Sequence, residues 1–367
     1  SNGVLFAHGF NNLRNDKFLV RDFEKNFSKV LKVNYSQAVT SGTVAQLVAM
    51  LAMGIKRGDE VITQAHTFVA TVESILAIGA TPVIVDIDET YNMDITDLEN
   101  AITEKTKLIV PVHMLGNPCR MTEIMKIGQK YSIPVLEDAC EALGGSYKNQ
   151  PLGSIGHAGI FSLDFAKTIT TGEGGMITTN DKDIYTYCKE YHDHGHQSNP
   201  KYPRGRDTRV IPGMNYRMTE MQGAVGLAQL KKLDFIVKKN RENKFYLKNN
   251  INGEKIIFRE ITDENGDLAD TLIFNFESKS LADIFVKKYN NHGYFTKNIP
   301  DALDWHFSGT WNQMFNETPM YKNSWSTVWS KSANLLYRSV AIPIFVKNDK
   351  DYMNKQIDAI NKILKEI

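Results

Sequence analysis

FSLDFAKTITTGEGG, residues 161–175, carries one lysine, Lys167, between an apolar strand and a turn rich in threonine and glycine. A lysine surrounded by apolar side chains is expected to have a lowered pKa, because burial disfavours its charged form. Such an amine is nucleophilic near neutral pH and can form a Schiff base with an aldehyde or a ketone. For a lysine taken alone, the ordinary alternative is a surface residue at the end of a strand. The remainder of the chain decides between the two interpretations.

The composition is that of an ordinary globular protein: of 367 residues, 42% are hydrophobic and 23% are charged. The 43 basic and 42 acidic residues nearly balance, so electrostatics give no reason to expect nucleic acid or a membrane as partner. Cys119, Cys140 and Cys188 have the spacing of neither a disulfide framework nor a metal site. We therefore expect no metal and a reducing cytoplasm. No apolar run approaches the ~18 residues that a transmembrane helix needs.

Short apolar strands alternate with helices from about residue 39 to residue 179. Strands are expected at 60–63, 81–86, 108–112 and 134–138, with helices at 43–53, 68–78 and 122–131. Strands that are apolar on both faces and separated by helices indicate a mainly parallel sheet covered on both sides. The fold class is therefore α/β, and ligands of such sheets bind at the carboxyl ends of the strands.

The pattern changes after about residue 230. A long charged helix is expected over 231–250, then strands at 256–258, 272–276 and 339–343 and a helix at 281–290. This mixture predicts a smaller α+β domain, so the chain divides into a large domain, residues 1–230, and a small C-terminal domain, residues 231–367. Residues 193–213 are rich in His, Arg, Pro and Gly and predict a long loop, which in a compact protein is usually functional or disordered.

Four further sites along the sequence could hold a flat, phosphorylated cofactor near Lys167. Ser41-Gly42-Thr43 precedes a helix whose free N–H groups can bind phosphate, although a plain helix cap is the alternative. Phe68 follows a strand and could stack on a ring, whereas most phenylalanines are simply buried. Asp138 ends a buried strand, where it could pair with a protonated ring nitrogen, cap a helix or belong to a buried ion pair. Ser162, five positions before Lys167, could bind the same phosphate.

Each signal is weak alone, but their order is that of a fold-type I enzyme dependent on pyridoxal 5′-phosphate (PLP). The chain resembles the DegT/DnrJ/EryC1/StrS family of PLP-dependent sugar aminotransferases over about residues 10–350. The resemblance implies a mainly parallel seven-stranded sheet between helices and a smaller C-terminal domain. It also implies amino transfer from L-glutamate to a keto sugar, in amino-sugar or lipopolysaccharide biosynthesis. The matching segments are 41–43, 58–62, 67–71, 79–86, 111–116, 137–139, 167–175 and 213–220.

The resemblance assigns a role to each matching residue. The catalytic residues would be Lys167, which forms the Schiff base and carries a proton, and Asp138, the partner of the ring nitrogen. Asn215 would reach the cofactor phosphate of a neighbouring subunit, which implies a homodimer with shared sites. The implied cofactor-binding residues are Gly42, Thr43, Phe68, Asp138, Glu141, Ser162, Lys167 and Asn215.

Two positions depart from the family pattern. Glu141 stands where many members have Gln or His beside the PLP 3′ oxygen, and a carboxylate there would repel a phenolate unless one of them holds a proton. Asp164 stands where many members have His. One branch of the family replaces the lysine itself by His and catalyses dehydration, so the intact Lys167 favours transamination over a PLP-dependent sugar dehydratase. A non-catalytic sensor that kept the fold would be expected to lack Lys167 or Asp138.

Two segments are candidates for the substrate site. Arg206 and Arg209 lie in an arginine-rich loop that could bind carboxylate or phosphate, or that could simply be solvated. Trp305 and His306 lie in an aromatic segment that could pack on a sugar face or belong to the core of the small domain. Both segments also resemble the branch that makes 8-amino-3,8-dideoxy-manno-octulosonate from an 8-oxo sugar acid. A nucleotide-linked 3- or 4-keto-6-deoxy sugar and this sugar acid are therefore both open as substrates.

Overall fold

A central sheet of seven strands organises the molecule, of which the computed structural model describes residues 3–6, 8–9, 11–315 and 328–367. One part of the sheet has the order β3-β2-β4, and the other has the order β1-β9-β8-β5. Parallel bridges from Ile109 to Val135 and from Val112 to Asp138 join β4 to β5 and make one sheet. The strands are β1 (Tyr35–Val39), β2 (Glu60–Gln64), β3 (Thr81–Val85), β4 (Thr106–Val110), β5 (Leu136–Asp138), β8 (Ala158–Ser162) and β9 (Gly175–Thr179).

Strand β9 is antiparallel to both of its neighbours, and the other pairings across the sheet are parallel. The predicted mainly parallel, seven-stranded sheet is confirmed. Alternate residues of each strand enter different cores, as a period of two requires. Ile62 and Phe161 belong to one core, while their neighbours Val61 and Ile160 belong to another. Both faces are therefore buried.

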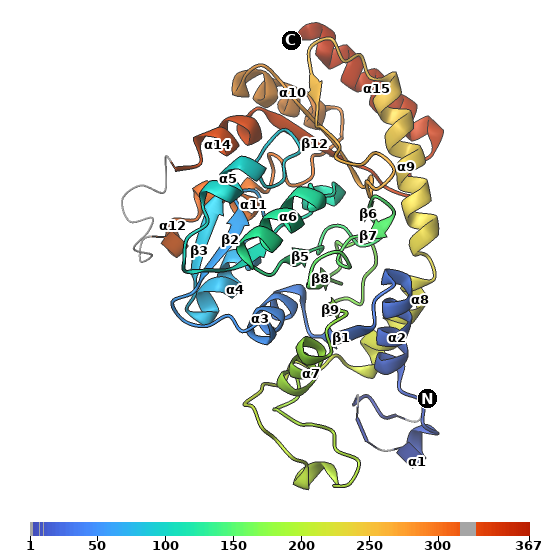
Figure 1. Cartoon of the computed structure of the whole chain (residues 1–367). Helices are drawn as coiled ribbons and strands as arrows, with labels where there is room; N and C mark the ends of the chain where they lie inside the picture. The colour runs from blue at the N-terminus through green and yellow to red at the C-terminus, as the bar shows by residue number, and fades with distance from the viewer. Residues whose placement is uncertain (1–2, 7, 10, 316–327) are drawn as a thin grey trace.

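Helices cover both faces of the sheet (Figure 1). Phe23 and Phe27 of α2 and Ile124 of α6 pack in the core of one face, whereas Val48 of α3 and Cys188 of α7 pack in the core of the other. The bounds are α2 (Leu19–Leu31), α3 (Gly42–Ala52), α4 (Ala70–Ile78), α5 (Ile95–Asn100), α6 (Met121–Tyr131), α7 (Lys182–Tyr191) and α8 (Glu220–Leu230).

The C-terminal third forms an α+β layer at one end of the molecule (Figure 1). Its antiparallel sheet has the order β10-β11-β12 and its own core, in which Phe274, Phe285 and Ile360 are fully buried. A further core joins Ile84 and Leu115 of the first part of the chain to Ile273 of the last, and the division at residue 230 stays a prediction. The elements are α9 (Leu233–Asn250), β10 (Ile257–Phe258), β11 (Thr271–Asn275), α10 (Lys279–Asn291), α14 (Ser330–Tyr337), β12 (Ser339–Pro343) and α15 (Lys350–Glu366).

Short helices and strands lie in the segments that connect the main elements. The predicted long loop runs from α7 to α8 and extends away from the sheet (Figure 1). Backbone bridges from Asp193 to Asn215 and from His196 to Arg209 close it. The short elements are α1 (Asn11–Arg14), η1 (Met114–Gly116), β6 (Ser146–Tyr147), β7 (Gln150–Pro151), η2 (Arg204–Arg206), α11 (Leu303–His306), η3 (Ser308–Thr310) and α12 (Asn312–Phe315).

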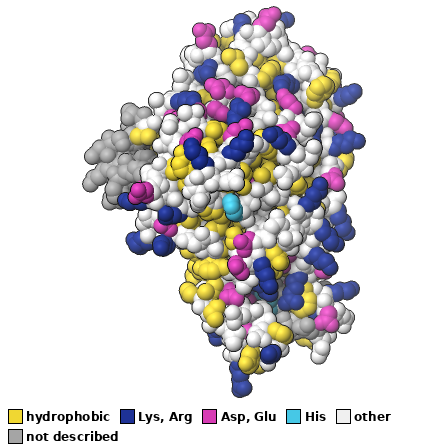
Figure 2. All heavy atoms as spheres, viewed as in Figure 1, with side chains coloured by type: hydrophobic (Ala, Val, Ile, Leu, Met, Phe, Trp, Pro, Cys, Tyr) yellow, Lys and Arg dark blue, Asp and Glu magenta, His cyan; other side chains and the backbone are white. Residues whose placement is uncertain are grey.

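Basic and acidic side chains are interspersed over the face drawn in Figure 2, as the near-neutral net charge of +1 suggests. None of the helices in the described part of the chain combines the length and the apolar character that crossing a bilayer requires.

Candidate active site

A cavity of about 340 Å³ lies at the carboxyl edge of the parallel strands. Asp138 ends β5 and Ser162 ends β8, and Phe68 follows β2, so the strand ends bring these residues together. Residues of the C-terminal third close the opposite side of the cavity. The predicted residues that line it are Gly42, Thr43, Phe68, Asp138, Glu141, Ser162, Lys167 and His306.

The N-terminus of α3 forms one end of this cavity. The Ser41 side chain caps the helix by accepting a hydrogen bond from the Val44 N–H at 3.2 Å. The first N–H groups of a helix have no partner within it, so those at Gly42 and Thr43 are available to an anion. A Cβ atom at Gly42 would lie 2.8 Å from Cβ of Ser162. Glycine is therefore what allows the helix to approach the end of β8 and to place Ser162 beside the same N–H groups.

Asp138 is a buried carboxyl group with neutral hydrogen-bond donors. Its Oδ2 accepts a hydrogen bond from Thr71 Oγ1 at 3.0 Å and a short one from Gln46 Nε2. Its Oδ1 accepts from the Cys140 N–H at 3.1 Å. Burial raises the pKa of Asp138, although these hydrogen bonds and the charge of Lys167 oppose the rise. A cationic ring nitrogen would supply the positive charge that these donors lack.

Lys167 and Glu141 form an ion pair in the cavity, with 3.4 Å between Nζ and Oε1. Burial alone would lower the pKa of Lys167, but the charges of Glu141, Cys140 and Asp164 outweigh it and raise that pKa. The expectation of a lowered lysine pKa is therefore wrong for this chain, because the surroundings of the amine are acidic rather than apolar. Burial likewise favours a neutral Glu141, yet Lys167 and the other nearby cations hold the pKa of Glu141 below its usual range.

The aromatic segment contributes both of its predicted residues to this region. Phe68 and Trp305 stack with ring centroids 6.2 Å apart and planes within 12° of parallel. The His306 ring packs against Phe68, with centroids 5.4 Å apart, and its Nε2 lies 3.9 Å from Oε1 of Glu141. Its Nδ1 donates to the carbonyl of Ala302 at 2.8 Å. Burial lowers the pKa of His306 despite the nearby Glu141, so the neutral imidazole is favoured.

Trp305 touches the cavity only through Phe68, and three further predicted residues lie apart from its lining in the described chain: Asn215, Arg206 and Arg209 are exposed in and beside the α7–α8 loop. In the same loop, Asp193 binds Arg217 Nη1 at 2.6 Å and also binds Arg204. The loop is therefore held in shape, but it presents these three predicted residues to solvent within one subunit.

Several residues that line the cavity or hold its lining in place were not predicted from the sequence. Gln46 and Thr71 look like ordinary residues of amphipathic helices, and only the fold shows that both donate to Asp138. Lys297 pairs with Asp270 at 2.6 Å on the C-terminal side of the cavity. Asn298, beside Lys297, also lines it. No local motif marks these residues, because they meet the cavity through tertiary contacts.

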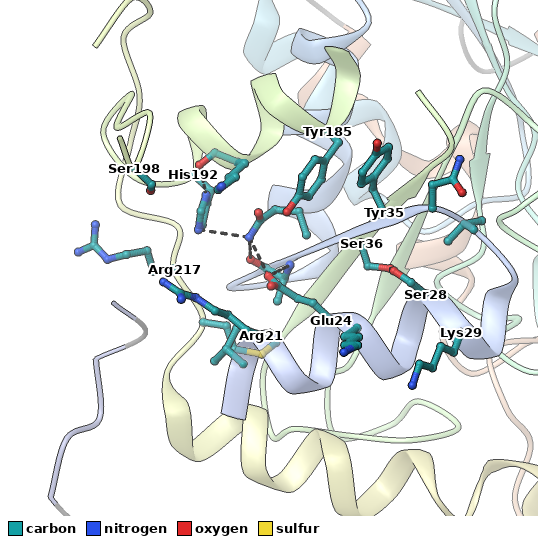
Figure 3. A pocket seen from close by; sticks show the side chains of 18 of the residues that line it. Arg21, Glu24, Ser28, Lys29, Tyr35, Ser36, Tyr185, His192, Ser198 and Arg217 are labelled. Carbon is teal, nitrogen blue, oxygen red and sulfur yellow. Dashed lines mark hydrogen bonds between the residues drawn. The ribbon is translucent and has the colours of Figure 1, made fainter. Parts of the chain in front are cut away.

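A second cavity, of about 690 Å³, lies between α2, β1 and α7 (Figure 3). Glu24 Oε1 accepts hydrogen bonds from Gln37 Nε2 and from the Ala38 N–H, both at 2.9 Å. Gln37 Nε2 also lies 3.3 Å from Nε2 of His192. Burial raises the pKa of Glu24 to about 7, although the Ala38 hydrogen bond opposes this. None of the described residues that line this cavity also lines the first one.

Comparison with known sequences identifies relatives over nearly the whole chain. A sequence model of the DegT/DnrJ/EryC1/StrS aminotransferase family matches residues 11–361. The GDP-perosamine synthase of Escherichia coli O157:H7 is 41% identical over 245 residues, covering 66% of each chain. That of Caulobacter vibrioides is 43% identical over 219 residues, covering 59% of this chain and 57% of the synthase. The chain thus matches about three fifths of the length of these synthases. An uncharacterized protein of Methanocaldococcus jannaschii is 35% identical over 359 residues, covering 94% of this chain and 89% of that protein.

Solved structures agree with this match. The aminotransferase from Psychrobacter cryohalolentis superimposes with a TM-score of 0.87 at 28% identity, covering 97% of this chain and 95% of that one. NtdA from Bacillus subtilis, solved with the bound cofactor PMP, has a TM-score of 0.83 at 25% identity. The match covers 95% of this chain and 77% of NtdA. GDP-4-keto-6-deoxymannose-3-dehydratase has a TM-score of 0.81 at 27% identity, covering 93% of this chain and 92% of the dehydratase. The same fold therefore serves transamination and dehydration.

Proposed function

Because the chain belongs to the DegT/DnrJ/EryC1/StrS aminotransferase family, we propose that it uses PLP to move an amino group from L-glutamate to a nucleotide-linked keto sugar. One observation carries the proposal. A single cavity brings Lys167 together with Asp138, Ser162 and the N-terminus of α3. These groups match, in turn, a carbonyl, a ring nitrogen and a phosphate, which are the polar parts of PLP.

The residues of the cavity fit this cofactor. When bound, PLP supplies a reactive carbonyl carbon and an electron-withdrawing ring. The N–H groups of Gly42 and Thr43 and the Ser162 hydroxyl would hold the phosphate, which suits a helix N-terminus. Phe68 would cover the ring face, backed by Trp305. The buried position of Asp138 lets it hold a proton at the ring nitrogen out of contact with bulk water.

Lys167 would perform the proton transfers. It would anchor the cofactor through its Nζ, and once the amino donor had displaced it, the freed amine would be placed to take the proton from Cα of the donor and to return it to the cofactor. The pair with Glu141 keeps its Nζ at a fixed position. In the return half of the cycle Lys167 would make the same proton transfers in reverse, with the keto sugar in place of 2-oxoglutarate.

The relatives favour a nucleotide-linked sugar as acceptor. GDP-perosamine synthases are 41% and 43% identical to the chain over the matched segments. A GDP-linked keto sugar is therefore the first substrate to present. The 8-oxo sugar acid, with 8-amino-3,8-dideoxy-manno-octulosonate as product, stays a prediction from the sequence. The intact Lys167 favours transamination over the dehydration named in one structural relative.

A homodimer would complete the site. Helix α8 packs one face on α2, where Gly223 approaches Val20, and exposes Met221 and Val225 on the other. Phe165, at the rim of the cavity, is 80% exposed. An exposed apolar surface beside an active site is typical of a subunit interface. A second copy on this face would bring its own α7–α8 loop, with Asn215, toward the cofactor phosphate.

Presenting the two acceptor classes separately tests the proposal. The PLP-loaded protein should convert L-glutamate to 2-oxoglutarate only when a GDP-linked keto sugar or an 8-oxo sugar acid is present, and we expect the GDP sugar to be preferred. Lys167→Ala should abolish turnover in both cases. Turnover that survives this substitution, or a wild type that transaminates neither acceptor, would refute the proposal.

A further inference from the structure

The cavity is short of positive charge for the molecules that it would hold. Its described lining contains five carboxyl groups and two lysines, Lys167 and Lys297. Under the proposed function, PLP brings a phosphate and glutamate brings two carboxylates, while Lys167 is occupied by the cofactor. His306 favours its neutral form because burial lowers its pKa. Within the described part of one subunit, Lys297 is thus the lining cation that remains for the amino donor.

Lys297 is held beside the cavity by β12. Its backbone N–H donates to the Ala341 carbonyl at 2.8 Å. Its Nζ donates to Oδ2 of Asp270 at 2.6 Å, which uses one of the three N–H groups of a lysine ammonium. The side chain keeps 27% of its surface exposed, so the remaining donors can reach a ligand. Lys297 lines the same cavity as Lys167 and its partner Glu141, so its ammonium faces the space in which the reactive nitrogen lies.

Asn298, the next residue, has an amide nitrogen that lacks a partner. Its Nδ2 is buried and makes no hydrogen bond to any described residue. Its backbone has φ of 64°, the left-handed region that few residues other than glycine adopt. A buried donor without an acceptor destabilises the fold, and strain of this kind persists mainly at binding sites. A ligand with an acceptor oxygen would satisfy this amide.

We infer that Lys297 and Asn298 form the subsite for the α-carboxylate of the amino donor, with Asp270 moderating its strength. The inference rests on the proposed function. A carboxylate has two oxygens, which suit an ammonium and an amide side by side. The α-carboxylate is attached to the carbon whose proton Lys167 takes, so it must lie near Lys167. A GDP-linked acceptor carries its charge on the diphosphate, at the far end of the sugar from the reacting carbon, and the sugar hydroxyl groups beside that carbon are neutral.

Charge-neutral variants test the subsite without leaving Asp270 unpaired. The probes are L-glutamate in the first half-reaction of the PLP-loaded protein, and 2-methyl-L-glutamate, which binds but has no Cα proton to lose. We expect Asp270→Asn/Lys297→Met to weaken both by about 10- to 100-fold, as loss of a charged hydrogen bond does. Asn298→Gly, which keeps the backbone conformation, should weaken both several-fold. Asp270→Asn alone should tighten both, because it frees Lys297.

Two controls, a probe and a variant, separate the possible outcomes. The affinity for 4-aminobutyrate, which lacks the α-carboxylate, should not change in any of these variants. Lys355→Met, which removes a surface lysine paired with Asp351, is the matched control and should match wild type. Unchanged glutamate affinity in the double variant, or weaker affinity in Asp270→Asn, would overturn the inference while leaving the proposed function intact. A wild type that accepts no amino donor would refute both.

Discussion

At the scale of single residues, Lys167 has a partner that the sequence did not reveal. Desolvation lowers the pKa of a buried amine, but an adjacent carboxylate acts in the opposite direction. In this chain the carboxylate of Glu141 is the stronger influence, so the free lysine is held protonated. A protonated amine cannot attack a carbonyl. Cofactor capture must therefore draw on the small fraction of Lys167 that is neutral.

Replacing Glu141 tests this directly. In Glu141→Gln the pKa of Lys167 should fall, because the main group that raises it is gone while burial remains. The rate at which the cofactor-free protein binds PLP covalently, followed by absorbance, should then reach its plateau at a pH lower by about one unit or more. Asp164→Asn is the matched control and should move the profile less, since Asp164 is a weaker influence on the pKa. An unchanged profile in Glu141→Gln would contradict the ion pair.

Glu24 gives a second prediction, about stability. Its folded-state pKa of about 7 lies above the value of an unfolded glutamate. Between these two values the unfolded chain ionises before the folded one, so stability falls as pH rises through this window. Glu24→Gln should flatten that slope and gain roughly 1–2 kcal/mol in free energy of unfolding near pH 8 relative to pH 5. Urea unfolding at the two pH values measures it, and a slope equal to that of wild type would count against the raised pKa of Glu24.

At the scale of elements, the phosphate end of the site depends on one close contact between α3 and β8. Gly42→Ala would put a Cβ atom 2.8 Å from Cβ of Ser162, and separating the two should cost about 1–3 kcal/mol. PLP affinity should fall with it, because the N–H groups and Ser162 move apart. Equilibrium dialysis of PLP measures the loss. Gly205→Ala, where no atom lies within 4 Å, should leave both stability and affinity unchanged.

The elements that the sequence predicted are those in which apolar residues recur at a regular spacing. The apolar strands β2, β3 and β4 and the helices α3 and α6 were expected within about two residues of their observed bounds. Lys167, Asp138 and Ser162 were also predictable, because each stands at or just beyond the end of a strand. The roles of Gln46, Lys297 and Asn298 were not, because these residues reach the cavity through folding and have no local pattern that distinguishes them.

At the scale of the whole molecule, the proposed homodimer would build each site from two subunits. Lys167→Ala and Asn215→Ala should each be inactive as pure proteins, since each removes a group from every site. A mixture that is unfolded and refolded together should regain activity, because hybrid dimers contain one site with both groups intact. Met221→Glu should yield monomers by light scattering and prevent this recovery. Absence of recovery from hybrids whose formation is verified would contradict the shared site.

Following the amino nitrogen from L-glutamate to the sugar is the most direct test of the proposed transamination. L-glutamate labelled with heavy nitrogen is supplied with a GDP-linked keto sugar and the PLP-loaded protein, and the sugar product is weighed by mass spectrometry. We predict that the product carries the heavy nitrogen, that 2-oxoglutarate forms in equal amount, and that Lys167→Ala gives neither. A deoxygenated sugar without the label, or label that stays in glutamate, would contradict transamination.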